Sequence, residues 1–260
     1  MNRIDKLFSS GPKRLLSIYF CAGAPRPDGT ADVIRTLADE GVDLIEIGIP
    51  FSDPMADGPV IQDAAAEALR GGMSLEKLFS QLESIRSDVD IPLILMGYLN
   101  PIFRYGFERF CARCARVGID GLIIPDLPFK DYLEHYKAVA ERNGLRFIML
   151  ITPETSEERV RLIDANTSGF LYLVSSAATT GAQQDFDAQK QAYFKRVEEM
   201  HLRIPRLVGF GISNRKTFDA ACAHASGGII GSRFVSLLKE HGGDARTAIR
   251  RLKADLGLQA

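Results

Sequence analysis

The stretch LIEIGIPFSDPMADGP, residues 44–59, places an apolar strand pattern directly before a proline-bounded loop. Side chains alternate along a strand, so Glu46 shares one face with Leu44 and Gly48, whereas the isoleucines share the other face. A carboxyl group in such an apolar run is costly to desolvate. The stretch therefore predicts a strand whose isoleucine face meets helices and whose opposite face carries an acidic group for chemistry.

The same unit, a short apolar strand followed by a helix, recurs along the chain. Strand patterns begin at eight positions: Leu15, Leu44, Pro92, Gly121, Arg146, Gly169, Arg206 and Gly227. Helix patterns occur between them at 30–40, 75–87, 106–117, 132–143 and 156–166, and the segment RIDKLFSS (3–10) predicts an extra helix before the first strand. Without a linker to divide the chain, this alternation predicts an α/β fold with one domain over 1–260: a single (β/α)8 TIM barrel with an extra N-terminal helix.

Composition excludes several classes of function. The formal net charge is −1 and the basic residues are scattered, which disfavours nucleic acid and membranes as partners. The N-terminus is too polar for a signal peptide, and no apolar run approaches the roughly 20 residues of a membrane span. Four cysteines without a framework spacing agree with a cytoplasmic protein. Cys111 and Cys114 fall on the buried stripe of a helix pattern, so packing is favoured and no metal is predicted.

Two carboxyl groups lie where a barrel builds its site. Glu46 is near the carboxyl end of its strand and points inward, and the next loop holds Asp53 and Asp57 at the rim. The alternatives are ordinary: aspartate is a common turn residue, and a buried glutamate is often paired with an arginine or capped by backbone amides. A buried glutamate below a rim aspartate is nevertheless typical of acid–base catalysis.

Two glycine-rich turns follow the seventh and eighth strand patterns. They read GFGIS (209–213) and IIGSRF (229–234), and the second runs into a helix start. Barrels of this kind bind phosphate at these two loops, through backbone N–H groups and a helix N-terminus. One such turn alone is an ordinary tight turn, but two after consecutive strands favour a phosphate site.

Five segments, in this order, closely resemble the tryptophan synthase alpha chain family: IEIGIPFSDPMADGPVIQDA, PLILMGYLNPIF, GLIIPDLPF, LVGFGIS and IIGSRF. The resemblance spans nearly the whole chain, and PFSDPxADGP is highly specific. It implies a lyase of tryptophan biosynthesis that cleaves indole-3-glycerol phosphate to indole and glyceraldehyde 3-phosphate. It also implies a beta chain as partner in an α2β2 heterotetramer, with pyridoxal phosphate in that beta chain and no cofactor in this chain.

The resemblance also implies roles for single positions. Glu46 matches the acid–base glutamate of the family, and Asp57 matches the aspartate that binds indole. Pro50, Asp53 and the loop after the sixth strand (175–181) match the face toward the beta chain. The matching substrate-binding positions are Tyr19, Tyr98, Asn100, Tyr172, Thr180, Gly181, Gly209, Phe210, Gly211, Gly231 and Ser232.

Some positions depart from the family pattern. The loop SSAATTG (175–181) has Ala178 where Gly is usual and Thr179 where Val is usual, and alanine does not adopt positive φ cheaply. The segment GAP (23–25) lacks the Asp or Tyr often found before its proline. Arg233 stands where a small residue is common and either adds charge near the phosphate or points to solvent. Asp126 in IPDLP, by contrast, matches a site-rim aspartate.

Two alternatives stay open on sequence alone. Another phosphate-binding barrel enzyme of amino-acid biosynthesis would share the late glycines, although it is not expected to carry PFSDPxADGP after the glutamate strand. A regulatory subunit with weakened catalysis would agree with the altered loop, whereas Glu46, Asp57 and Tyr172 argue against it. Release of indole from indole-3-glycerol phosphate by the purified chain separates these alternatives.

Overall fold

The computed structural model describes residues 1–175, 186 and 188–259. Its strands are β1 (Leu15–Cys21), β2 (Leu44–Gly48), β3 (Leu93–Met96), β4 (Gly121–Ile123), β5 (Arg146–Phe147), β6 (Met149–Ile151), β7 (Leu171–Val174), β8 (Arg206–Gly209) and β9 (Gly227–Ile230). They form one sheet in the order β5-β4-β3-β2-β1-β9-β8-β7-β6, and every neighbouring pair is parallel.

The two end strands of that order, β5 and β6, are halves of one chain segment. The strand predicted from Arg146 is interrupted at Ile148, whose N–H donates to the Leu122 carbonyl at 2.9 Å. Its first half pairs with β4 and its second half pairs with β7. The split segment therefore joins both ends of the sheet and closes it into the predicted (β/α)8 barrel, with the fifth predicted strand counted as two.

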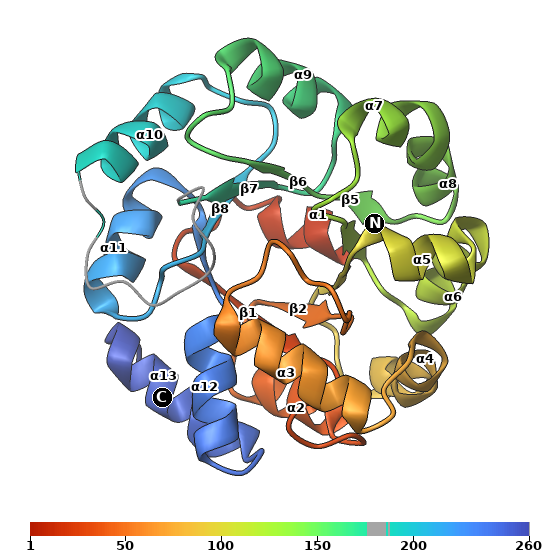
Figure 1. Cartoon of the computed structure of the whole chain (residues 1–260). Helices are drawn as coiled ribbons and strands as arrows, with labels where there is room; N and C mark the ends of the chain where they lie inside the picture. The colour runs from red at the N-terminus through yellow and green to blue at the C-terminus, as the bar shows by residue number, and fades with distance from the viewer. Residues whose placement is uncertain (176–185, 187, 260) are drawn as a thin grey trace.

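Helices surround the strands, and all but the first of them form an outer ring (Figure 1). They are α1 (Arg3–Phe8), α2 (Thr30–Asp39), α3 (Pro59–Arg70), α4 (Leu75–Leu82), α5 (Leu99–Tyr105), α6 (Phe107–Val117), α7 (Phe129–Asp131), α8 (Lys137–Arg142), α9 (Glu157–Asn166), α10 (Ala188–Glu199), α11 (Arg215–His224), α12 (Ser232–Glu240) and α13 (Ala245–Leu256). Each predicted helix range contains helix, but two ranges are subdivided. A 3-10 turn (Ile85–Ser87) follows α4, and a π-helical turn (Tyr132–Tyr136) precedes α8.

Helix α1, the extra N-terminal helix that the sequence predicts, lies inside the ring across one end of the barrel (Figure 1). Its Ile4 is fully buried and packs with Leu15, Leu44 and other inward side chains of the strands. The Asn2 amide that caps this helix also donates to the carbonyls of Asp120 and Gly144, at 2.9 Å each. Helix α1 thus seals the N-terminal end of the barrel.

Two apolar layers follow from the alternation along each strand. On β2, Ile45 and Ile47 pack in the outer layer against the helices, whereas Leu44 belongs to the inner cluster. This confirms the predicted orientation, which sends Glu46 inward. Cys111 and Cys114 are fully buried in the outer layer, which confirms the packing interpretation of that pair.

The described residues lack two features. They contain no cluster of His, Cys, Asp and Glu that could hold a metal ion. None of their helices is both long enough and apolar enough to cross a membrane.

A buried ion pair ties the floor of the barrel together and yields a stability prediction. Asp120 accepts from Arg86, from Arg3 and from the Leu93 N–H at 2.9 Å. Asp120→Ala should lower the free energy of unfolding by about 3 kcal/mol, because it leaves the half-buried Arg86 without its carboxylate and the buried Leu93 N–H without its acceptor. Urea unfolding measures this loss. The control Asp88→Ala removes an exposed pair with Arg35 and should cost less than about 1 kcal/mol; equal losses in both variants would contradict the prediction.

Candidate active site

Glu46 is enclosed near the carboxyl end of β2. Its side chain is 0% exposed, and its Cα pairs in register with that of Tyr19. The Ser17 hydroxyl donates to Oε1 at 3.5 Å, and Oε2 has no hydrogen-bond partner among the described residues. Burial raises the pKa of Glu46 to about 8, although the Ser17 hydrogen bond acts in the opposite direction. The described part of the chain offers it neither an arginine partner nor a backbone cap, and with a pKa of about 8 the carboxyl is mostly neutral at pH 7.

Asp57 lies at the rim, on the loop between β2 and α3. The Tyr98 hydroxyl donates to Asp57 Oδ2 at 2.9 Å and itself accepts from the Ala56 N–H at 3.0 Å. The Gln62 side chain donates to the Asp57 carbonyl at 2.7 Å. Burial raises the pKa of Asp57, and the Tyr98 hydrogen bond opposes this rise. Tyr98, predicted to bind substrate, therefore holds the rim aspartate in place.

Two tyrosine rings lie over two glycines inside the barrel. A Cβ atom on Gly48 would come 2.2 Å from the Tyr19 hydroxyl oxygen, and one on Gly209 would come 2.2 Å from that of Tyr172. Only glycine leaves these rings their space. Burial raises the pKa of both tyrosines, and the charges of the two carboxyls described above raise it further. Both tyrosines thus stay neutral.

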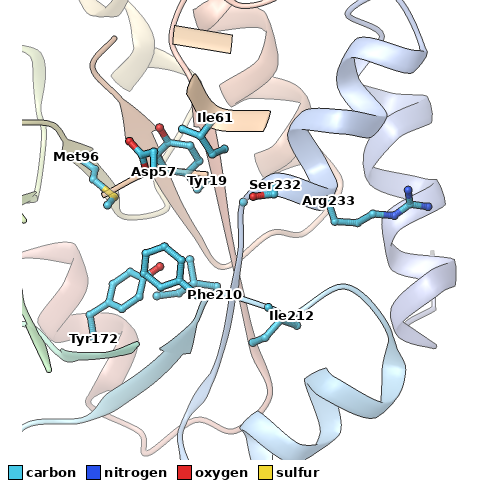
Figure 2. Close-up of a pocket in the computed structure, with 12 residues that line it drawn as sticks. Tyr19, Asp57, Ile61, Met96, Tyr172, Phe210, Ile212, Ser232 and Arg233 are labelled. Atoms are coloured by element: carbon cyan, nitrogen blue, oxygen red, sulfur yellow. The ribbon is translucent and has the colours of Figure 1, made fainter. Parts of the chain in front are cut away.

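A pocket opens at the C-terminal end of the barrel (Figure 2). With its open mouth included, it encloses ≈ 490 Å³ of space between atoms. Its lining consists of Tyr19, Asp57, Ile61, Met96, Tyr172, Phe210, Gly211, Ile212, Ile229, Gly231, Ser232 and Arg233. Figure 2 shows Asp57 and Tyr19 on one side of the pocket, Tyr172 and Phe210 on another, and Ser232 on a third. Glu46 is not part of this lining.

The apolar walls are the part of the pocket that the sequence prediction missed. They come from Ile61, Met96, Ile212 and Ile229. The alternation of side chains along the strands could have predicted two of these wall residues. Met96 follows the inward Ile94 by two positions on β3, and Ile229 belongs to the inner cluster.

The end of the pocket formed after β8 and β9 has two backbone features. Phe210 and Gly211 both have positive φ, at 64° and 79°, and the Ser175 hydroxyl donates to the Phe210 carbonyl at 2.6 Å. Gly231 precedes α12 and gives it no side-chain cap. A helix start without such a cap can receive an anion, and the phosphate site stays a prediction.

Arg233 takes neither of the two positions considered from the sequence. Its guanidinium pairs with Asp255 of α13, at 2.7 Å from Nη2 and 3.2 Å from Nε. Figure 2 shows the side chain directed away from the pocket. It links the first turn of α12 to the last helix.

Two further predicted positions, Asn100 and Asp126, do not line this pocket. Asn100 is exposed on α5, and the Asp126 carboxylate accepts from the Leu99 N–H at 2.8 Å, at the start of the same helix. Thr180 and Gly181 lie outside the described residues, as do Ala178 and Thr179. The roles assigned to all of these residues stay predictions.

A closed (β/α)8 barrel with an apolar pocket at the carboxyl ends of its strands defines a barrel enzyme. The chain belongs to the tryptophan synthase alpha chain family, whose model matches residues 8–259. The tryptophan synthase alpha chain of Bacteroides fragilis is 68% identical over 260 residues, covering 100% of this chain and 98% of the relative. The solved tryptophan synthase subunit alpha of Legionella pneumophila superposes with a TM-score of 0.86 at 34% identity, covering 98% and 96% of the two chains.

The fold is also similar to a chain in the solved tryptophan synthase complex from Pyrococcus furiosus. The TM-score is 0.85 at 32% identity, and the match covers 94% of this chain and 98% of that chain. Family membership confirms the resemblance and excludes the other phosphate-binding barrel enzymes. It makes the chain a lyase of tryptophan biosynthesis with a beta chain as its partner.

The raised pKa of Glu46 predicts how stability depends on pH. The folded chain keeps this proton up to about pH 8, whereas the unfolded chain loses it near 4.5. Between these values the unfolded state binds fewer protons, so the wild type loses stability as pH rises. Glu46→Gln has no titrating group at this position, so its stability does not fall in this way. Its melting temperature minus that of the wild type should increase from about pH 5 to about pH 8 and then level off.

Calorimetry across this pH range measures the difference, and Glu40→Gln is a control of opposite sign. Arg250 lowers the pKa of Glu40, so this carboxylate contributes stability above its unfolded pKa that is lost as the pH falls. The melting temperature of Glu40→Gln should therefore fall further below that of the wild type as pH rises through the acid range. A pH-independent difference for Glu46→Gln would show that Glu46 is ionised in the folded chain.

Proposed function

We propose that Glu46 and Asp57 carry out, in this chain, the cleavage of indole-3-glycerol phosphate to indole and glyceraldehyde 3-phosphate. The observation that carries the proposal is the water-excluded Glu46 carboxyl, which has one oxygen without a partner among the described residues and belongs to a residue paired in register with Tyr19 of the pocket. An acid whose pKa lies near the working pH can both give and take a proton.

The reaction needs two proton transfers. The bond between indole C3 and the first carbon of the glycerol chain breaks when C3 gains a proton and the hydroxyl on that carbon loses one. The bonding electrons return to the indole ring, and the hydroxyl oxygen becomes the aldehyde oxygen of glyceraldehyde 3-phosphate. Glu46 donates the first proton, and its carboxylate accepts the second. Glu46 therefore ends the reaction with the same number of protons with which it began.

Asp57 acts at the other end of the indole. Protonation at C3 makes the ring cationic, and the positive charge is shared by the indole N–H. A carboxylate fixed in advance stabilises such a charge without having to reorganise. Tyr98 and Gln62 supply this fixation through their hydrogen bonds at the rim.

The phosphate orients the substrate rather than reacting. We place it against the N–H groups of Gly211 and of the first turn of α12, with the Ser232 hydroxyl beside them. Met96, Ile61 and the two tyrosine rings then surround the indole. Gly181, from the predicted family positions, would complete this grip.

The first functional prediction concerns Glu46→Gln. This variant keeps the shape of the side chain but can neither give nor take the two protons. It should fold normally and lose indole release by about 10²–10⁴-fold, the contribution of a positioned acid–base group. Indole release from indole-3-glycerol phosphate by the purified chain measures it. Activity close to that of the wild type in a folded Glu46→Gln chain would remove Glu46 from the chemistry.

The Asp57→Asn variant is the comparison for that assay. It should lower turnover while leaving the binding of glycerol phosphate unchanged, because Asp57 acts on the indole end.

The wild-type rate itself decides between an active lyase and the weakened regulatory subunit. Wild-type indole release no faster than that of Glu46→Gln would favour the regulatory alternative.

We further propose that the rim loop contacts the beta chain in an α2β2 complex through Asp53, whereas Pro50, the other position that the resemblance implies, is buried at the start of the loop. Asp53 is exposed, and Met55 beside it is 88% exposed. Two turns tie this loop to the site: the Met55 N–H donates to the Asp53 carbonyl at 2.9 Å, and the Asp57 N–H donates to Pro54 at 3.1 Å. A partner that fixes Asp53 thereby fixes Asp57. The loop that starts at Ser175 is a second proposed contact, and its other residues lie outside the described part of the chain.

The location and the cofactor follow the family. We place the reaction in the cytoplasm, which agrees with four cysteines that form no disulfide. We assign pyridoxal phosphate to the beta chain and no cofactor to this chain. Glu46 gives one proton and takes one back during the cleavage, so the proton transfers need no cofactor, which supports that assignment.

The partner contact predicts that the beta chain accelerates indole release mainly through turnover, because docking orders Asp57 and excludes water. Asp53→Ala should lose this acceleration and keep most of the basal rate. The measurement is indole release with and without saturating beta chain. Asp219→Ala, which removes an exposed carboxylate on α11, should respond like the wild type. Full acceleration of Asp53→Ala would contradict the route through the rim loop.

A further inference from the structure

Ser17 is a polar residue in the apolar floor of the barrel. It lies on β1 at an inward position, between Leu15 and Tyr19, and its Cα pairs in register with that of Leu44. Its side chain is 0% exposed. Leu15 and Leu44 belong to the inner apolar cluster. A hydroxyl buried there costs free energy unless it makes a hydrogen bond.

The acceptor that the described residues offer to this hydroxyl is the Glu46 carboxyl. The Ser17 Oγ lies 3.5 Å from Oε1, and Oε2 is left without a partner. The two carboxyl oxygens are therefore not equivalent. One is tied toward the floor of the barrel, and the other keeps its lone pairs for another group.

We propose that Ser17 is a positioning residue, which anchors one oxygen of Glu46 so that the other faces the proton-transfer positions of the substrate. This inference rests on the proposed function, in which Glu46 transfers both protons. No other hydrogen bond from the described residues holds this carboxyl group. Orientation matters because proton transfer depends on a donor aligned with its acceptor.

The same contact affects the protonation of Glu46. A donor to a carboxylate favours the charged form, so Ser17 opposes the upward shift of the pKa that burial causes. The titratable groups that face this carboxyl are Tyr19 on β1 and Tyr172 on β7, both with raised pKa values. The next strand, β3, contributes Ile94 and Met96, which do not titrate. A change at Ser17 leaves these neighbours in place.

The test compares Ser17→Ala, which deletes the hydroxyl, with Ser17→Thr, which keeps it. Infrared spectroscopy of the full chain detects the protonated Glu46 carboxyl as the band that Glu46→Gln removes. In the wild type this band should titrate with a midpoint of about 8. In Ser17→Ala the midpoint should rise by about one pH unit, the size of one lost hydrogen bond to a charged group. In Ser17→Thr it should return to the wild-type value.

Indole release by the same proteins, saturated with beta chain, gives the second readout. For Ser17→Ala we expect kcat to fall by about tenfold at pH 7, with KM changed by less than about twofold. Ser17→Thr should recover most of kcat. Thr167→Val is the matched control, because it removes a buried hydroxyl that donates to the Phe147 carbonyl at the other side of the barrel floor. It should change neither the infrared midpoint nor kcat.

The outcomes are distinct. An unchanged midpoint and unchanged kcat in a folded Ser17→Ala chain overturn the proposal. A shifted midpoint with an unchanged kcat also overturns it, because the contact then exists without positioning the acid. If Glu46→Gln itself still releases indole, the proposed function fails, while the infrared midpoint of Ser17→Ala still decides whether the contact exists.

Discussion

The site depends on the exclusion of water from a single carboxyl group. Glu46 is enclosed by the inner apolar layer of the strands, and α1 seals that layer from below. Without this enclosure its pKa would return toward 4.5, and the group would be a permanently ionised base at neutral pH. The barrel thus does more than present residues at its rim: its closed floor sets the protonation state of the group above it.

The space for a ligand above that floor comes from small residues. Gly48 and Gly209 leave room for two tyrosine rings, and those rings form opposite sides of the pocket. Because a methyl group at either glycine would collide with a ring, the tyrosines and glycines act as matched pairs. Each pair joins neighbouring elements of the barrel: Gly48 lies on β2 beside Tyr19 of β1, and Gly209 lies on β8 beside Tyr172 of β7.

The recurrence of strand and helix patterns was sufficient to predict the architecture. The alternation of side chains along one strand was sufficient to predict the inward direction of Glu46. Both patterns are local properties of the sequence. The split of the fifth strand at Ile148 was not predictable in this way. Its apolar pattern is continuous, and the break arises because its two halves pair with different neighbours.

The contacts that hold Asp57 and Arg233 were also missed. Tyr98 and Asp57 are 41 positions apart, and Arg233 and Asp255 are 22 apart. No local pattern encodes such pairings. The resemblance identified Tyr98 as a site position, but only the geometry shows that it acts on the aspartate.

The position of α1 has a consequence for the order of folding. Asn2 makes its hydrogen bonds to backbone 118 and 142 positions further along the chain, and β1 pairs with β9, whose first residue is Gly227. Although β1 meets its other neighbour, β2, after a short stretch of chain, helix α1 and the β9 side of β1 find their partners only when much more of the chain has been made. Contacts so distant in sequence form slowly, because loop closure must precede them. Until then the inner layer around Glu46 stays open to water, so the carboxyl that is neutral in the finished barrel is synthesised as an ordinary charged glutamate.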